Sequence, residues 1–127
     1  MKFPELKLAR DREVTVEAHL CKRIKELGGK AYKFKSPQNA GVPDRLCVLP
    51  AGLVFFIEVK RGLGKLSPLQ VATLNDMANK GHYVAVVYTK EQVDGLVKTI
   101  ALMVKQSLAP VKIESSLYKA DGSKFTS

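Results

Sequence analysis

Phe55-Phe56-Ile57-Glu58-Val59-Lys60 is an apolar stretch that carries a carboxylate and an ammonium group near its end. Because side chains alternate across a strand, Glu58 and Lys60 point the same way, and the more apolar set points to the opposite face. Charges are costly to bury in an apolar strand unless they are paired or hold a metal ion. The stretch therefore predicts a buried strand with chemistry on one of its faces.

A third charge, Asp44, ends the segment Gly41-Val42-Pro43-Asp44, at the start of the apolar run Leu46 to Leu49. Pro50-Ala51-Gly52 predicts a tight hairpin turn between that run and the strand at 53–60. In such a hairpin Asp44 comes within reach of Glu58. An acid followed by an acid-x-lysine on the next strand indicates metal-dependent phosphodiester chemistry.

Two or three carboxylates suffice for Mg²⁺ (or Mn²⁺), which keeps several waters and lowers the pKa of bound water. Asp44 and Glu58 meet that need, with Glu17 as a candidate third carboxylate, and the backbone carbonyl of Val59 is an additional candidate ligand. Lys60 is placed to orient the attacking water or to offset charge in the transition state. The alternative is a structural ion pair between Lys60 and either acid.

Lysine and arginine number 21 against 12 aspartate and glutamate, a formal net charge of +9. A field of that sign favours a polyanionic partner, nucleic acid before a membrane surface. The alternative is a basic surface that only keeps the protein in solution. The acidic cluster described above favours the first interpretation.

The chain of 127 residues fits a single domain, 1–127, with a core at about 13–105 and a C-terminal extension at 106–127. Cys21 and Cys47 form neither a CxxC pair nor a disulfide framework and are expected to be small core residues. The sequence shows no signal-peptide pattern and no apolar run approaching the roughly 18 residues of a membrane span. We therefore expect a cytoplasmic protein with no membrane partner.

Periodicity and turn signals predict the order helix, three strands, helix, strand, helix, after an irregular arm at 1–11. The elements are a helix at about 12–27, a strand at 31–35, a loop at 36–43, strands at 45–49 and 53–60, a helix at 68–80, a strand at 82–88 and a helix at 90–105. The strand at 82–88 should lie parallel to that at 53–60, because a helix separates the two. An edge strand at 111–118 and a frayed tail at 119–127 complete the expectation.

The helices have recognisable faces. Apolar stripes are Val16, Leu20, Ile24 and Leu27 in the first helix, Val71, Leu74 and Ala78 in the second, and Val93, Leu96, Val97, Ile100, Met103 and Val104 in the third. Ser67 and Gln70 form a capping box around Pro68. Glu17 lies along the inward stripe, and spacing alone leaves open whether it faces a site or reaches solvent or a nearby lysine.

Other catalytic patterns fit poorly. His19 and His82 have no metal-type spacing with the cysteines, so a zinc site is not expected. Gly62-Leu63-Gly64-Lys65 is too short for a phosphate-binding P-loop. Neither a Ser-His-Asp nor a Cys-His arrangement stands out.

Several short motifs follow one another in a specific order between about residues 13 and 98. They are Glu17, Gly28-Gly29, Lys33-Phe34 with Ser36-Pro37, Gly41-Val42-Pro43-Asp44-Arg45, Phe56-Ile57-Glu58-Val59-Lys60, Ser67-Pro68-Leu69-Gln70 and Gly81. In this order they resemble the VRR-NUC (virus-type replication-repair nuclease) domain of the PD-(D/E)xK superfamily. The resemblance implies an α/β fold with a restriction-endonuclease-like αβββαβ core, a mixed central sheet flanked by helices. Gln38 departs from the pattern, since many relatives have glycine there.

The resemblance also implies roles for individual residues. Asp44 and Glu58 resemble the metal-binding acids, and Lys60 the catalytic lysine. Glu17 resembles the acid of the first helix, which implies a further metal ligand. Gln70 resembles a helix glutamine that lines the catalytic site, a role compatible with its cap.

Small stand-alone members of this family are similar to dimeric nucleases that cut branched DNA, Holliday junctions in particular. The resemblance therefore implies a homodimeric DNA endonuclease in a bacterial or phage-infected cell, with two sites for two cuts on a four-way junction. The candidate phosphate contacts are Lys33, Lys35, Arg45, Arg61 and Lys65. For the segment 60–65, a solvated loop is the alternative. Other functions that stay open are a nuclease acting on flaps or ordinary duplex and a non-catalytic basic DNA-binding protein.

Overall fold

The computed structural model describes residues 3–60 and 62–106. The elements, in chain order, are α1 (Phe3–Glu26), β1 (Lys30–Lys33), β2 (Arg45–Val48), β3 (Val54–Val59), α2 (Pro68–Asn79), β4 (Tyr83–Val87) and α3 (Lys90–Gln106). This order is the predicted one. The edge strand predicted at 111–118 and the tail at 119–127 lie outside the described residues.

One four-stranded sheet, in the order β1-β2-β3-β4, forms the centre of the fold. The first two pairings are antiparallel and the last, β3 with β4, is parallel. The parallel pairing predicted from the intervening helix is therefore confirmed. A short 3₁₀ turn, Pro50–Gly52, joins β2 to β3 at the predicted hairpin.

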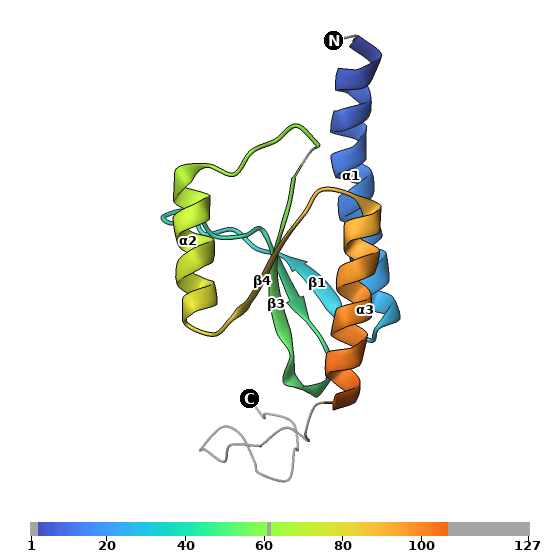
Figure 1. The fold of residues 1–127 in the computed structure, drawn as a ribbon, viewed down its shortest axis with the longest axis vertical. Helices are drawn as coiled ribbons and strands as arrows, with labels where there is room; N and C mark the ends of the chain where they lie inside the picture. The colour runs from blue at the N-terminus through green and yellow to red at the C-terminus, as the bar shows by residue number, and fades with distance from the viewer. Residues whose placement is uncertain (1–2, 61, 107–127) are drawn as a thin grey trace, which may run out of the picture.

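Helices cover both faces of the sheet (Figure 1). The long helices α1 and α3 pack side by side against one face, and α2 lies against the other. Between the sheet and the α1–α3 pair is the main core, which contains Val16, Leu20, Ile24, Cys47, Leu49, Phe55, Ile57, Val59, Val87, Val93, Val97 and Ile100. The predicted stripes of the first and last helices are confirmed, with Leu27, Leu96, Met103 and Val104 partly buried at their edges.

The N-terminal segment is helical from Phe3, so the irregular arm predicted for residues 1–11 is wrong for the part that the structure describes. The physical reason is visible in the sequence. Pro4 falls in the first turn, where a missing N–H costs nothing. The residues between it and the predicted start at Arg12 are mostly leucine, lysine, arginine and alanine, which are good helix formers.

Helix α2 begins with the predicted capping box. The Ser67 hydroxyl accepts a hydrogen bond from the Gln70 N–H (3.1 Å), and the Gln70 side-chain oxygen accepts one from the Ser67 N–H (2.9 Å). Leu74 is buried as predicted, but Val71 is 42% exposed and Ala78 is also exposed. Those two predictions were wrong, because α2 is the single described helix on its face of the sheet and leaves part of its own apolar stripe uncovered.

The loop between β1 and β2 packs against α2 through Gly41. A Cβ atom on this buried residue would lie 2.7 Å from the carbonyl oxygen of Leu69 and would also collide with the Thr73 hydroxyl. The loop is closed locally, since the N–H of Asn39 donates to the Ser36 carbonyl (3.0 Å) and that of Val42 to the Asn39 carbonyl (3.2 Å). Only glycine permits this approach, which holds the segment before Asp44 against α2.

Gly41→Ala should therefore lower the free energy of unfolding, by about 1–3 kcal/mol, because the loop must move away from α2. Gly95→Ala, at an exposed position of α3 with open space around it, is the matched control and should add about 0.5–1 kcal/mol. Urea unfolding of both variants checks the pair. Equal stability of Gly41→Ala and wild type would contradict the close approach.

Candidate active site

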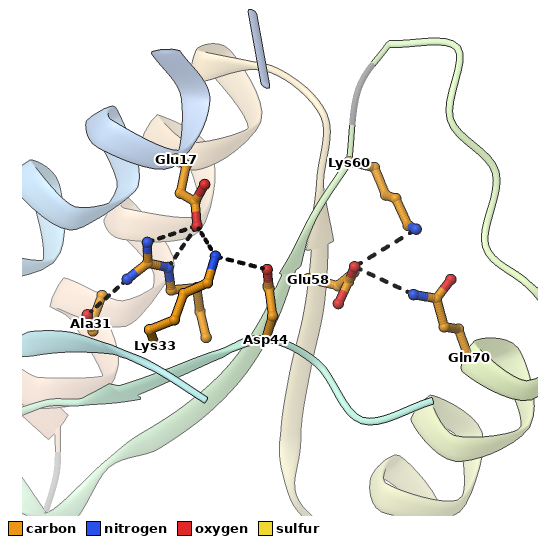
Figure 2. Close-up of polar contacts among 8 residues, drawn as sticks. Glu17, Ala31, Lys33, Asp44, Glu58, Lys60 and Gln70 are labelled. Atoms are coloured by element: carbon orange, nitrogen blue, oxygen red, sulfur yellow. Dashed lines mark hydrogen bonds and ion pairs between the residues drawn. The ribbon is translucent and has the colours of Figure 1, made fainter. Parts of the chain in front are cut away.

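Asp44, the residue just before β2, lies next to Glu58 of β3 (Figure 2). In the β2–β3 register Arg45 is opposite Ile57, so the antiparallel pairing brings Asp44 opposite Glu58. The backbone of Asp44 faces the Glu58 carboxylate closely enough to lower the pKa of Glu58. The hairpin expected from the sequence thus brings the two acids together.

Glu58 is 8% exposed, and one of its oxygens, Oε2, is contacted from two sides. The Lys60 ammonium lies 3.7 Å away, and the side-chain amide of Gln70 donates to the same oxygen at 3.4 Å. Burial, and next the negative charge of Asp44, raise the pKa of Glu58, while Lys60 and the backbone of Asp44 act in the opposite direction. The ionised carboxylate pair is therefore poorly compensated by the protein alone.

Asp44 has a buried oxygen, Oδ1, that receives no hydrogen bond from any described residue. Its other oxygen, Oδ2, lies 3.7 Å from the Lys33 ammonium. Buried polar atoms are almost always satisfied, so an orphaned carboxylate oxygen beside a second carboxylate needs a partner. A hard divalent cation with oxygen ligands fits that donor set.

Glu17 is held by two basic residues. Its Oε1 accepts hydrogen bonds from Arg45 Nη2 (2.6 Å), Arg45 Nε (3.0 Å) and Lys33 Nζ (3.1 Å). Burial raises the pKa of Glu17, but these hydrogen bonds and charges outweigh it and hold the pKa below its ordinary value. The contact with a nearby lysine is the one expected for an acid at the edge of the stripe.

Within the described part of the chain, no three or more His, Cys, Asp or Glu side chains cluster closely enough to hold a metal ion. Glu17 thus does not form a three-acid cluster with Asp44 and Glu58 here. Its role as a ligand stays a prediction, as does that of the Val59 carbonyl. Two acids, Asp44 and Glu58, remain as the adjacent pair.

A cavity of about 560 Å³ opens beside the acid pair. Its lining comprises Phe34, Lys35, Ser36, Pro37, Asn39, Ala40, Val42, Asp44, Glu58 and Gln70. Much of this lining comes from the β1–β2 loop, which was not predicted from the sequence as a wall of the site. The sequence does contain an indication of this wall. A loop of turn-forming residues leads directly into Asp44, the predicted metal-binding acid, and must therefore border the site.

The predicted phosphate contacts lie in different surroundings. Lys35 is exposed and lines the cavity, and Lys65 is exposed in the loop before α2. The guanidinium of Arg45 is instead occupied by Glu17 and by the carbonyl of Ala31, to which Nη1 donates at 3.3 Å. Arg61 lies outside the described residues. A role in binding DNA stays a prediction for all of them, including Lys33.

Comparison with known proteins identifies the family. No protein-family model matches the sequence. Over 80 residues, 63% of this chain, the sequence is 40% identical to "Putative nuclease p44" of Acyrthosiphon pisum secondary endosymbiont phage 1, and the match spans 86% of that protein. A solved structure described as a VRR_NUC domain superposes with a TM-score of 0.64 at 33% identity, covering 68% of this chain and 95% of that one.

The chain belongs to the VRR-NUC family.

The resemblance noted in the sequence is thereby confirmed, and so is the α/β restriction-endonuclease-like fold. Membership identifies the VRR-NUC chain as a nuclease, and nucleases of the PD-(D/E)xK type generally use divalent metals. None of the described helices is long and apolar enough to cross a membrane.

The raised pKa of Glu58 leads to a prediction about stability without metal. The ionised side chain is less favourable in the folded VRR-NUC domain than in the unfolded chain, first because of burial and then because of Asp44. Below the ordinary glutamate pKa, Glu58 is protonated in both the folded and the unfolded chain and does not lower the free energy of unfolding. As the pH rises from there through the raised pKa of the folded protein, the free energy of unfolding falls. Glu58→Gln should abolish that loss, so the variant should be more stable than wild type at neutral pH.

The measurement is urea unfolding in EDTA at a series of pH values. The difference in unfolding free energy, Glu58→Gln minus wild type, should increase with pH between the ordinary glutamate pKa and the raised pKa of Glu58 in the folded protein. Above the raised pKa the difference should level off. Glu26→Gln, on an exposed glutamate at the end of α1, is the control for removal of a negative charge. A Glu58→Gln variant less stable than wild type at neutral pH would show that Lys60 and Gln70 compensate the carboxylate fully.

Proposed function

We propose that this VRR-NUC domain is a DNA endonuclease that hydrolyses phosphodiester bonds with Mg²⁺ or Mn²⁺ held by Asp44 and Glu58. The observation that carries the proposal is the adjacent carboxylate pair, in which Glu58 is buried and the buried oxygen of Asp44, Oδ1, lacks a hydrogen-bond donor among the described residues. The Val59 carbonyl and Glu17 are further candidate ligands. When bound, the metal supplies a Lewis acid for the phosphate and lowers the pKa of a coordinated water.

Residues of the chain complete the chemistry. The Lys60 ammonium, 3.7 Å from Glu58 Oε2, is placed to orient a water or to offset charge that develops on the phosphate. Gln70 donates to Glu58 and so fixes the orientation of that carboxylate. We assign Asp44 and Glu58 to metal binding, Lys60 to transition-state stabilisation and Gln70 to the wall of the site.

The proposed substrate is branched DNA, a four-way junction in particular, cut by a homodimer. The net charge of +9 supports a polyanionic substrate, and the cavity of about 560 Å³ gives room for a nucleotide beside the acids. Recognition would rest on phosphate contacts and on junction shape, with Lys35 and Lys65 as exposed candidates. A two-fold pair would bring two sites to the two symmetric strands of one junction.

Removal of single groups tests the chemistry. Asp44→Ala and Lys60→Ala should each lower the cleavage rate at least about 100-fold, because metal binding or transition-state charge stabilisation is lost. Binding of DNA and the cooperative unfolding transition should be retained. Lys80→Ala, which removes an exposed lysine paired with Asp76 on α2, is the matched control and should cut at the wild-type rate. A fully active Lys60→Ala protein would contradict the assignment.

Substrate choice is tested with labelled four-way junction, flap and linear duplex, each with Mg²⁺ and with EDTA. A junction-specific dimer should give paired, metal-dependent cuts in the junction alone. In a supercoiled cruciform plasmid it should give linear rather than nicked product, since both cuts fall within one binding event. Cutting of flaps or linear duplex would discard the junction and keep the site. Tight binding of every substrate without cutting would show a non-catalytic DNA-binding protein.

A further inference from the structure

Lys33 forms a bridge between two acids of the site (Figure 2). Its Nζ lies 3.1 Å from Glu17 Oε1 and 3.7 Å from Asp44 Oδ2. The same ammonium therefore contacts an acid of α1 and an acid at the start of β2. Lys60 makes the corresponding contact with Glu58, so each carboxylate of the proposed metal site has one lysine beside it.

The fold places Lys33 there by two independent constraints. In the β1–β2 register Lys33 is opposite Arg45, and the next N–H, that of Phe34, donates to the Asp44 carbonyl at 2.7 Å. Arg45 in turn fixes Glu17 through two hydrogen bonds to Oε1, the oxygen that Lys33 also contacts. Glu17 and Arg45 thus form a fixed support that holds the Lys33 ammonium next to Asp44.

We propose that the Lys33 ammonium is a built-in counter-cation of the site, which a divalent metal ion displaces from Asp44 when it binds. This inference rests on the proposed metal site. In the protein without metal, the lysine partly neutralises Asp44, which lies against the buried carboxylate of Glu58. A divalent ion bound by Asp44 repels an ammonium at that distance, so the two cations compete for the same carboxylate.

Lys33 is suited to leave. Its side chain is 54% exposed on an edge strand, whereas that of Lys60 is 20% exposed. A lysine has a flexible four-carbon stem, so the ammonium can move away from Asp44 without disturbing the core. Arg45, at 14% exposure and bonded to Glu17 and the Ala31 carbonyl, stays in place when Lys33 moves. Of the two basic residues that contact Glu17, we therefore assign only Lys33 to competition with the metal ion for Asp44.

The test is calorimetric titration of the full-length protein with Mn²⁺ in the absence of DNA. Lys33→Met removes the competing charge while keeping much of the side-chain volume, and should tighten Mn²⁺ binding about fivefold or more. Lys33→Arg retains the charge and should bind Mn²⁺ close to the wild-type affinity. Lys25→Met is the matched control, because it removes an equal charge from an exposed lysine in the last turn of α1, a side chain with no ion pair in the described structure.

Each outcome decides the proposal. Tighter binding by Lys33→Met alone supports displacement of the lysine. Equal or weaker binding by Lys33→Met overturns it and leaves the nuclease proposal intact. An equal gain in Lys25→Met also overturns it, because it would show a general effect of net charge. Absence of Mn²⁺ binding by every protein, wild type included, would remove the metal site and overturn both proposals. The Mn²⁺-induced rise in melting temperature provides the second readout, and it should be larger for Lys33→Met than for wild type.

Discussion

The pairing of β2 with β3 forces two carboxylates together, and the rest of the site compensates for this contact. Asp44 and Glu58 are brought opposite each other by a register that the buried side chains of the hairpin fix. A shift of one residue would turn Phe55 and Ile57 out of the core, so the core does not allow the acids to separate. The repulsion between the acids is therefore maintained by the same packing that stabilises the domain.

The surroundings of the acids reduce this cost without removing it. Lys60 and Gln70 reach Glu58 from one side, and Lys33 reaches Asp44 from the other. Glu17 accepts hydrogen bonds from both Lys33 and Arg45. One Asp44 oxygen still has no donor in the described structure, and the pKa of Glu58 is still raised. Uncompensated charge of this kind is common in sites that bind a ligand, because function there is maintained at a cost in stability.

Elements with a strong local signal were predictable from sequence. Alternation gave the two faces of β3, and Ser67 with Pro68 gave the start of α2 within one residue. The exposure of Val71 was not predictable, because it depends on how far α2 extends over the sheet. The arginine partner of Glu17 was not predictable either, since Arg45 is 28 residues away and its direction follows from the β1–β2–β3 register. Local periodicity fixes which face a residue takes, but only tertiary packing fixes its partner.

Gln70 connects the fold to the site most directly. Its side-chain oxygen accepts from the Ser67 N–H at the start of α2, while its side-chain nitrogen donates toward Glu58. One amide thus satisfies a helix terminus and a buried carboxylate together, which requires both a donor and an acceptor on one side chain. Glutamate would satisfy the cap equally well, but it would bring a third negative charge to the acid pair. The capping position therefore needs an amide for a reason that lies in the site, and the orientation of α2 is tied to that of Glu58.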